Sequence, residues 1–227
     1  MKQSGTLYLV PTPIGNLKDM TFRAIEVLQS VYRILAEDTR NSVKILRHFE
    51  ISTPMESFHM HNEHRKVEHF MNMLHEGNDL ALITDAGTPG ISDPGFLLVR
   101  LAAEVNVPVI SLPGATAFVP ALINSALPSH NFVFEGFLPV KKGRKSRMDG
   151  LRNEKRTVIL YESPHRMIKT LRELGEALGS DRAASVSREI SKKFEETRRG
   201  TLHTLQLHFE EHPPKGEFVI CVAGTGN

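Results

Sequence analysis

The stretch Leu80–Gly95 has the sequence LALITDAGTPGISDPG, and the rest of the chain can be placed relative to it. Its first residues, Leu80–Ile83, form a short apolar run of the kind found in strands that are buried on both faces of a parallel sheet. The strand has to end at Asp85, because the glycines that follow favour turns and Pro89 lacks a backbone donor. Open α/β sheets bind their ligands at such carboxyl-terminal loops. The loop is therefore a candidate ligand site, although an ordinary strand-to-helix connection uses the same residue types.

The residues of this loop indicate what it could bind. Its glycines allow a ligand to come close to the backbone, and the Asp85 carboxylate is suited to ribose hydroxyls or to a cation. The end of the stretch predicts the start of a helix, with Ser92 or Asp93 as the N-cap and Pro94 in the first turn.

The same pattern, an apolar run followed by a proline- and glycine-rich loop, occurs at two other places. Thr6–Val10 leads into Pro11–Asn16, and Val107–Leu112 leads into Pro113–Ala117, where Thr116 is the expected cap of the next helix. If these strands are parallel, the three loops lie at one edge of the sheet and build one cleft. None of them contains G-x-G-x-x-G or a Walker lysine, which argues against a dinucleotide or ATP site.

Strand-like and helix-like segments alternate along the chain, which is the pattern of βαβ units. A helix from Thr21 to Ser30, a strand from Tyr32 to Ala36 and a helix from Ser42 to Phe49 precede the central stretch. The pattern starts again after a linker at Leu127–Asn131, with a helix through Leu178 and strands at residues 132–138, 157–161, 183–188, 201–209 and 217–223. We therefore predict an α/β fold with two α/β domains. Residues 1–125 would have a mostly parallel sheet, and residues 126–227 would have a mixed sheet.

The chain has 227 residues, which is enough to bury a core without a disulfide or a metal. Its single cysteine, Cys221, lies in the apolar run 218–223, so we expect an inert buried thiol and a reducing compartment. The sequence has no apolar signal region at its start and no apolar run near the ~20 residues that a membrane span needs. These features predict a soluble, cytoplasmic protein with no membrane partner.

The formal net charge is only +2, but the basic residues are unevenly distributed. Lys141–Arg156 contains eight Lys or Arg residues against Asp149 and Glu154. Such a block is either a contact surface for the phosphates of a nucleic acid or a solvated, mobile loop.

Histidines are concentrated in residues 57–69, where His59, His61 and His64 could bind a metal. Zinc sites usually have closer Cys and His spacing, and a helix through Leu74 accounts for most of the segment, so we expect no metal and a polar face turned to the cleft. The absence of G-x-S-x-G and the buried cysteine argue against a nucleophilic enzyme. The residues alone thus indicate an α/β protein that holds a small nucleoside-like ligand.

Six stretches of the chain occur in a characteristic order. They are LVPTPIGNL at 9–17, AEDTR at 36–40, HNE at 61–63, TDAGTPGISDPG at 84–95, LPGATA at 112–117 and YESPHR at 161–166. Together they resemble the 16S rRNA (cytidine-2′-O)-methyltransferase family within the tetrapyrrole-methylase superfamily. The resemblance extends from Thr6 to Gly224.

This resemblance implies methyl transfer from S-adenosyl-L-methionine to the ribose 2′-hydroxyl of a cytidine in the decoding region of 16S rRNA, either free or in the 30S subunit. It also implies a tetrapyrrole-methylase-like pair of α/β domains with the cofactor folded in the cleft between them, and a homodimer. By matching positions, the residues that would bind the cofactor are Ile14, Ile83, Thr84, Asp85, Thr88, Thr116, Ala117, Tyr161 and Glu162.

A ribose hydroxyl is weakly acidic, so the transfer is expected to need a base. The candidates are Glu162, His165 and Glu189, with Asp38 and Glu63 as orienting groups, although each could equally cap a helix or pair with a neighbour. The residues expected to contact RNA are Arg40, His61, Lys141, Lys142, Arg144, Lys145, Arg166, Lys192 and Lys193. No metal is required.

Many members of the family continue for several dozen residues after the last strand, whereas this chain ends at Asn227. We therefore expect RNA binding to depend more on the basic block and on further cations such as Arg198 and Arg199. Two alternative functions are a small-molecule methyltransferase of the tetrapyrrole type, against which the basic block argues, and an RNA-binding protein without catalysis.

Overall fold

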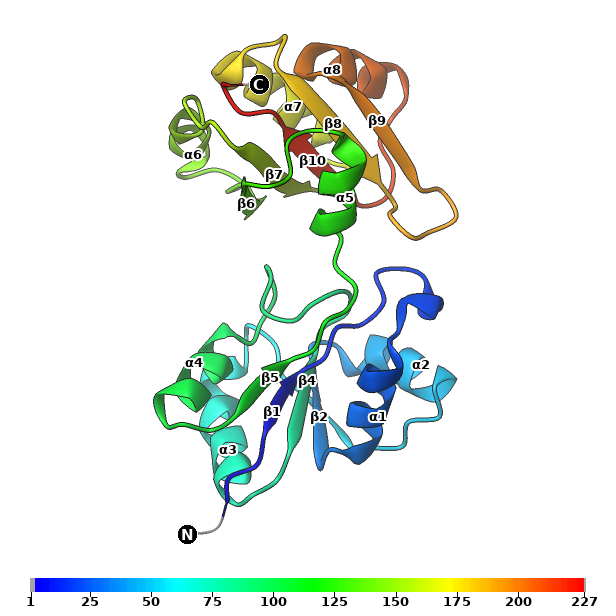
Figure 1. Ribbon diagram of the computed structural model, residues 1–227, viewed down its shortest axis with the longest axis vertical. Helices are drawn as coiled ribbons and strands as arrows, with labels where there is room; N and C mark the ends of the chain where they lie inside the picture. The colour runs from blue at the N-terminus through cyan, green and yellow to red at the C-terminus, as the bar shows by residue number, and fades with distance from the viewer. Residues whose placement is uncertain (1–2, 227) are drawn as a thin grey trace. The chain divides into compact units, whose positions relative to one another are not determined.

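The computed structural model describes residues 3–226, and this part of the chain divides after Thr116 into two compact domains (Figure 1). The predicted boundary after residue 125 would leave helix α5 (Phe118–Ser125) in the first domain. Instead, α5 packs against β-strands of the second domain, where Ala121 and Leu122 on one face of the helix are buried. Residues 3–116 are called the first domain below, and residues 117–226 the second domain.

The sheet of the first domain has the strand order β3-β2-β4-β1-β5, and its neighbouring strands are parallel throughout the described residues. The strands are β1 (Leu7–Leu9), β2 (Arg33–Ala36), β3 (Met55–Ser57), β4 (Leu80–Ile83) and β5 (Val109–Ser111). The central stretch of the sequence therefore supplies the middle strand, β4. The prediction of a mostly parallel first sheet is confirmed.

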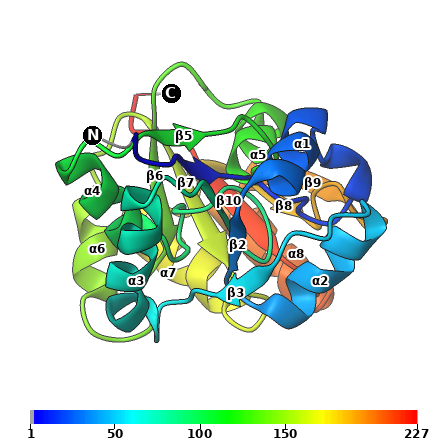
Figure 2. The ribbon, with the colours of Figure 1, turned by 90° about the horizontal axis from the view of Figure 1, so that it is seen from below.

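Helices cover both faces of this sheet, as Figure 1 and Figure 2 show. They are α1 (Phe22–Ser30), α2 (Thr39–His48), α3 (Glu63–His75) and α4 (Phe96–Glu104), with a short 3-10 helix η1 (Leu17–Asp19) after β1. Leu80 and Leu82 of β4 pack in the core under α3 and α4, whereas Ala81 and Ile83 pack in the core under α1 and α2. A strand buried on both faces needs an uninterrupted apolar sequence, which is why LALI was informative.

The sheet of the second domain has the strand order β6-β7-β10-β8-β9. Its strands are β6 (Phe132–Phe137), β7 (Thr157–Glu162), β8 (Ala183–Arg188), β9 (Glu196–Thr201) and β10 (Phe218–Val222). Strands β6 and β7 are parallel and the other neighbours are antiparallel, so the predicted mixed sheet is confirmed. Cys221 of β10 is buried, and burial raises the pKa of its thiol to about 12.

Helices also lie on both faces of the second sheet (Figure 1). The remaining helices are α6 (Arg144–Gly150), α7 (Met167–Leu178) and α8 (Leu202–Glu211). Leu171, Leu174 and Leu205 place α7 and α8 over the main core, and α5 lies on the opposite face. Helix α6 falls within the basic block, so the block is partly helical. Within residues 3–226, no helix is long and apolar enough to cross a membrane.

The prediction of a strand at residues 201–209 is wrong, because these residues begin α8. The Thr201 hydroxyl accepts a hydrogen bond from the Thr204 N–H, and the Thr204 hydroxyl accepts one from the Thr201 N–H, which makes a reciprocal helix cap. Leu202, Leu205 and Phe209 then share one buried helix face. The strand beside β8 at one edge of this sheet is β9 instead, whose sequence ETRRGT has no apolar alternation.

The predicted N-caps Ser92 and Asp93 are also wrong for α4, which begins after Gly95. Gly95 has a φ of +127°, and a Cβ at this position would lie 2.5 Å from Cδ2 of Leu82. The helix therefore starts where the backbone turns tightly against β4, and only glycine fits that conformation and that space.

Of two other predicted helix caps, one is wrong and one is confirmed. Thr116 does not cap α5, which begins after Ala117 without a side-chain cap. Thr21 caps α1 as predicted, since its hydroxyl accepts a 3.1 Å hydrogen bond from the Ala24 N–H.

Candidate active site

The loops that follow β1, β4 and β5 lie together at one edge of the first sheet. The backbones of Thr12 and Gly87 exchange two hydrogen bonds of 2.9 Å, and the Thr12 hydroxyl donates to the Thr84 carbonyl at 3.0 Å. The Thr88 hydroxyl donates to the Ala115 carbonyl, also at 3.0 Å. These bonds join the loop of β4 to the other two loops, as the parallel strand order predicts.

Close packing of these loops depends on bare backbone at Gly114. A Cβ at this position would lie 2.6 Å from Cβ of Pro11, far inside normal contact. Proline and glycine thus fix the shape of this edge with few side-chain atoms, and a ligand there could approach the backbone closely.

Three carboxyl groups lie near the ends of β2 and β4. Asp85 is exposed, its carboxylate accepts a 3.0 Å hydrogen bond from Nδ2 of Asn41, and its N–H donates to Oε2 of Glu37 at 3.3 Å. Asp93 is partly buried, and its pKa is raised to about 6, first by burial and then by the negative charges of Glu37 and, more weakly, Asp85. From the sequence Asp93 could be recognised only as a helix cap, because the proximity of Glu37 depends on the strand order.

The predicted cofactor residues of the first domain differ in what they can offer. Ile83 is fully buried, so only its backbone is available to a ligand. Asp85 is exposed, and Ile14, Thr88 and Thr116 are partly exposed. All five lie on or next to the bonded loops. Thr84, the sixth, is buried and accepts the hydrogen bond from Thr12 through its carbonyl.

The predicted RNA contacts of the first domain are both exposed. Arg40 lies at the start of α2, where its Nε donates to Oδ1 of Asp38 at 3.0 Å. The Arg40 hydrogen bond lowers the pKa of Asp38 to about 2, so Asp38 is a helix cap and ion-pair partner. His61 precedes α3, and its ring centroid lies 5.9 Å from that of His59. Within residues 3–226, no three His, Cys, Asp or Glu residues come together to hold a metal ion.

In the second domain, Glu162 ends β7 and is buried in a hydrogen-bonded network. One carboxylate oxygen accepts from the Thr170 hydroxyl at 2.6 Å, and the other accepts from the Ser163 N–H at 2.7 Å. Nη2 of Arg166 lies 2.8 Å from Oε1 of the same carboxylate. Because both oxygens of Glu162 are occupied by donors, the carboxylate is placed to fix the Tyr161–Arg166 segment.

Arg144 belongs to this network and not to the surface. Its side chain is buried, with Nε 2.7 Å from Oε2 of Glu173, Nη2 2.6 Å from the Thr170 hydroxyl and Nη2 4.0 Å from Oε2 of Glu162. The prediction that Arg144 contacts RNA is therefore wrong: the guanidinium anchors α6 to α7 and to the end of β7. Arg166, which is partly buried, divides its contacts between Glu162 and the Leu138 carbonyl.

Glu189, another candidate base, is also engaged. Its carboxylate accepts hydrogen bonds from the Glu217 N–H at 2.9 Å and from Nζ of Lys192 at 3.0 Å. Burial alone would raise the pKa of Glu189, but these two donors lower it, which makes the carboxylate a weaker base. Lys192 also lies 2.7 Å from Oε2 of Glu217, so its charge is compensated within the domain. His165, in contrast, is exposed and has no hydrogen bond or ion pair within the described residues.

Tyr161, the residue before Glu162, lies among aromatic rings. Its ring centroid is 5.1 Å from that of Phe134 and 5.6 Å from that of Phe137, both on β6. Phe118 of α5, the residue after Ala117, packs against Phe134 with 4.8 Å between the two ring centroids. The predicted cofactor residues of the second domain, Ala117, Tyr161 and Glu162, therefore border this aromatic group or the buried network beside it.

The basic block presents fewer free cations than its composition predicts. Arg147, Arg152 and Arg156 form ion pairs with Glu135, Asp149 and Glu154. The lysines Lys141, Lys142, Lys145 and Lys155 are exposed and form no ion pair within the part of the chain that the structure describes.

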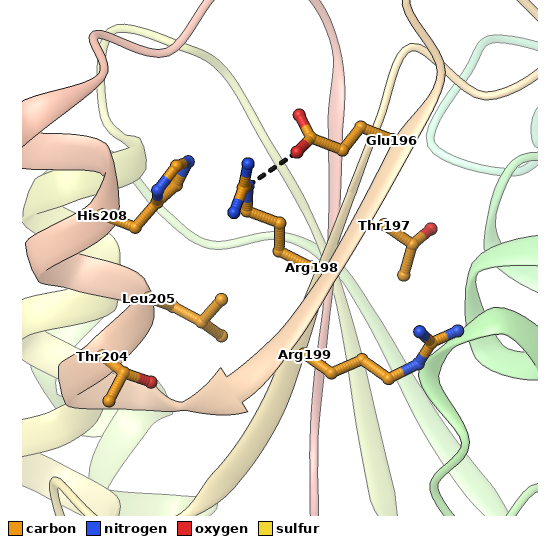
Figure 3. Close-up of a pocket in the computed structure, with 7 residues that line it drawn as sticks. All are labelled: Glu196, Thr197, Arg198, Arg199, Thr204, Leu205 and His208. Atoms are coloured by element: carbon orange, nitrogen blue, oxygen red, sulfur yellow. Dashed lines mark ion pairs between the residues drawn. The ribbon is translucent and has the colours of Figure 1, made fainter.

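A cleft of about 350 Å³ lies between β9 and α8 (Figure 3). Figure 3 shows Arg198 between Glu196 and His208, and Arg199 turned to the other side of the strand. Nε of Arg198 is 2.6 Å from Oε1 of Glu196, and Nε of Arg199 donates to the Asn124 carbonyl at 2.7 Å. The pKa of His208 is lowered, first by burial and then by the positive charge of Arg198. In this cleft the Arg198 guanidinium therefore lies between the Glu196 carboxylate and the His208 imidazole, whereas the Arg199 guanidinium is bonded on the other side of the strand.

Comparison with known proteins agrees with this geometry. Residues 6–206 match the family model of tetrapyrrole (corrin/porphyrin) methylases. The chain is 52% identical over 222 residues to the ribosomal RNA small subunit methyltransferase I of Synechocystis sp., covering 97% of this chain and 80% of the relative. It is 46% identical to the protein of the same name from Pseudomonas aeruginosa, covering 97% of this chain and 79% of that protein.

A solved structure with a similar fold is the uroporphyrin-III C-methyl transferase of Thermus thermophilus complexed with S-adenyl homocysteine. Its TM-score is 0.64 at 18% identity, with 97% of this chain and 98% of that chain covered. At that identity the likeness concerns the fold, whereas the two bacterial relatives are close in sequence over 97% of this chain, which spans 79–80% of their own length. The chain therefore belongs to the tetrapyrrole (corrin/porphyrin) methylase family, and within it to the group of the ribosomal RNA small subunit methyltransferases I.

Proposed function

We propose that this protein transfers a methyl group from S-adenosyl-L-methionine to the ribose 2′-hydroxyl of a cytidine in the decoding region of 16S rRNA. One observation carries the proposal: the proline- and glycine-rich loops of β1, β4 and β5 are bonded together at one sheet edge. They lie in a chain that is about half identical to small-subunit rRNA methyltransferases. Likeness to tetrapyrrole enzymes at 16–18% identity supports the fold and does not favour a tetrapyrrole substrate.

The chemistry of this edge fits the proposed cofactor. When bound, S-adenosylmethionine supplies a methyl group that is activated by a positively charged sulfonium. The carboxyl groups of Glu37, Asp85 and Asp93 give this edge a negative potential that favours a cation. The exposed Asp85 carboxylate can also accept hydrogen bonds from ribose hydroxyls. We propose that the cofactor is held by Ile14, Ile83, Thr84, Asp85, Thr88, Thr116, Ala117, Tyr161 and Glu162.

Among the three predicted bases, the contacts favour His165. Glu162 and Glu189 each accept hydrogen bonds from a backbone N–H and from charged or hydroxyl donors, and we assign them a positioning role. His165 lies within the Tyr161–Arg166 segment that Glu162 fixes, and its exposed imidazole could take the proton of a ribose hydroxyl. Accurate positioning of the hydroxyl would supply much of the remaining rate enhancement.

We propose that the RNA, as 16S rRNA or within the 30S subunit, contacts exposed cations of both domains. These are Arg40, His61, Lys141, Lys142, Lys145 and Lys193, with Arg166 and Lys192 acting mainly through their carboxylate partners. We also propose a homodimer, as in the resembling family, and a cytoplasmic location, since that is where ribosomal subunits are assembled.

The test is incubation of 30S subunits and of free 16S rRNA with S-adenosylmethionine that carries a tritiated methyl group. We expect label in the RNA and, after digestion, in 2′-O-methylcytidine. Label confined to small molecules would reject the proposal, and activity on a precorrin without activity on RNA would establish the tetrapyrrole alternative. Calorimetric titration with S-adenosylmethionine addresses the other alternative, since RNA binding without cofactor binding would identify a non-catalytic RNA-binding protein.

A further inference from the structure

The loop between β8 and β9, residues 189–195, presents an aromatic ring and an ammonium group at its tip. Phe194 is 62% exposed, although it is a large apolar side chain. Nζ of Lys193 lies 5.5 Å from the centroid of the Phe194 ring, within the range of a cation–π contact. An exposed phenylalanine has an unfavourable solvation energy and gives this loop no core packing. The stability of the loop therefore does not explain why a phenylalanine stands at this position.

The loop that carries this ring is held in one conformation. Glu189 and Ser191 have φ angles of +50° and +67°, which are unfavourable for non-glycine residues. The Lys192 ammonium lies within 3.0 Å of Glu189 and within 2.7 Å of Glu217, and the Ser191 N–H donates to Oε2 of Glu195 at 2.7 Å. The ring is therefore displayed on a fixed support, which lowers the entropy cost of binding something to it.

The charges around the tip suit a polyanion. The Glu195 carboxylate is turned back to the Ser191 N–H, and Glu196 pairs with Arg198. Lys193 is exposed and has no acidic partner among residues 3–226. The cleft lined by Arg198, Arg199 and His208 follows directly along β9 (Figure 3).

We propose that Phe194 is a stacking platform for an unpaired RNA base, and that Lys193 contacts a phosphate beside it. Unpaired bases are recognised by stacking on aromatic side chains, while cations follow the sugar–phosphate backbone. A paired base in a helix is already stacked on both faces, so this site selects single-stranded or unstacked RNA. The strand then continues along β9 towards the Arg198 cleft. The inference rests on the proposed function, because it specifies how the same rRNA substrate is held.

The test uses the full-length protein and a short single-stranded oligoribonucleotide that contains 2-aminopurine, whose fluorescence falls when it stacks. The wild type should quench the fluorescence, and Phe194→Leu, which keeps the apolar bulk, should abolish the quench. The affinity of this variant should fall roughly 5- to 150-fold, whereas Phe194→Tyr should stay within about threefold of the wild type. Phe22→Leu is the matched control, because Phe22 is 87% exposed in the first domain and should leave RNA binding unchanged.

Methylation of 30S subunits by the same variants gives a second readout. Phe194→Leu should raise KM for the subunit by a similar factor, with cofactor binding unchanged, which shows that the variant is folded. If the wild type methylates RNA but Phe194→Leu has the wild-type affinity and quench, the inference is overturned and the proposed function stands. Unchanged RNA binding with a changed oligomeric state would also overturn it, by assigning the ring to a protein contact. A wild type that neither binds nor methylates RNA would reject both.

Discussion

At the scale of single residues, Asp93 is a carboxyl group whose ionisation the fold opposes. Burial and the charges of Glu37 and Asp85 raise its pKa from 3.8 to about 6. The folded protein therefore binds this proton more tightly than the unfolded chain does. It follows that Asp93 supports the fold fully below pH 3.8, and that this support is lost as the pH rises to about 6.

Replacement of Asp93 by Asn should therefore stabilise the cofactor-free protein at neutral pH. Relative to the wild type, we expect no gain at pH 4 and a gain of about 1 kcal/mol at pH 7, after allowance for the solvent that still reaches the carboxyl group. Urea unfolding at several pH values measures this difference. Asp38→Asn is the control of opposite sign, because the pKa of Asp38 is lowered to about 2 and its charge supports the fold at neutral pH. Equal stability of Asp93→Asn and the wild type at pH 7 would contradict the assignment.

At the scale of helices and strands, the buried side chain of Arg144 holds α6, the helical part of the basic block, against α7. Its guanidinium joins α6 to Thr170 and Glu173 of α7 and lies near Glu162 at the end of β7. Loss of one partner from a buried ion-pair network leaves an uncompensated charge, which is more costly than the loss of a surface pair.

Arg144→Met should consequently lower the free energy of unfolding by about 3 kcal/mol, at the low end for buried pairs because Arg166 still compensates Glu162. Arg152→Met is the matched control, since the Arg152–Asp149 pair is exposed and should change stability by less than about 1 kcal/mol. Denaturant unfolding of both variants tests this. Similar losses in the two variants would mean that Arg144 is not an anchor.

Elements with a strong local pattern could be predicted from the sequence, and elements defined by tertiary neighbours could not. The run at β4 was decisive because it is buried on both faces, whereas ETRRGT at β9 forms an edge strand with little burial to mark it. The segment TLHTLQLHF fits a helix through Leu202, Leu205 and Phe209, but its last apolar residues also alternate like a strand. The reciprocal cap between Thr201 and Thr204 explains why it is helical.

The features of the candidate site also fall into those that could be predicted from the sequence and those that depend on tertiary neighbours. Parallel strand order was enough to bring the Thr12, Gly87 and Ala115 loops to one edge. The burial of Arg144 depends on partners in α7, and the raised pKa of Asp93 depends on a neighbour after β2, so neither follows from local sequence. From composition alone Arg144 was predicted to be an exposed cation, because composition does not reveal that Glu173 and Glu162 compensate its charge.

At the scale of the whole molecule, a small net charge conceals separate charged surfaces. The chain has a formal net charge of +2, yet Lys141, Lys142 and Lys145 form an exposed group without ion pairs within residues 3–226. A lysine or arginine that already forms an ion pair displaces few counterions from the RNA when it approaches a phosphate. An unpaired lysine displaces more of them. These three lysines should therefore contribute more to RNA affinity than the paired arginines beside them.

Lys141, Lys142 and Lys145 changed together to Gln should weaken binding to a decoding-region RNA fragment and flatten its salt dependence. Each lost phosphate contact on a single strand lowers the slope of log affinity against log salt by about 0.7, so the triple variant should lose about two units of slope. Titrations between about 50 and 200 mM KCl measure this slope. Lys44, Lys169 and Lys215 are also exposed, and their change to Gln lowers the net charge equally. If this second triple variant flattens the slope as much as the first, then overall charge, and not the lysines of the basic block, brings the RNA to the protein.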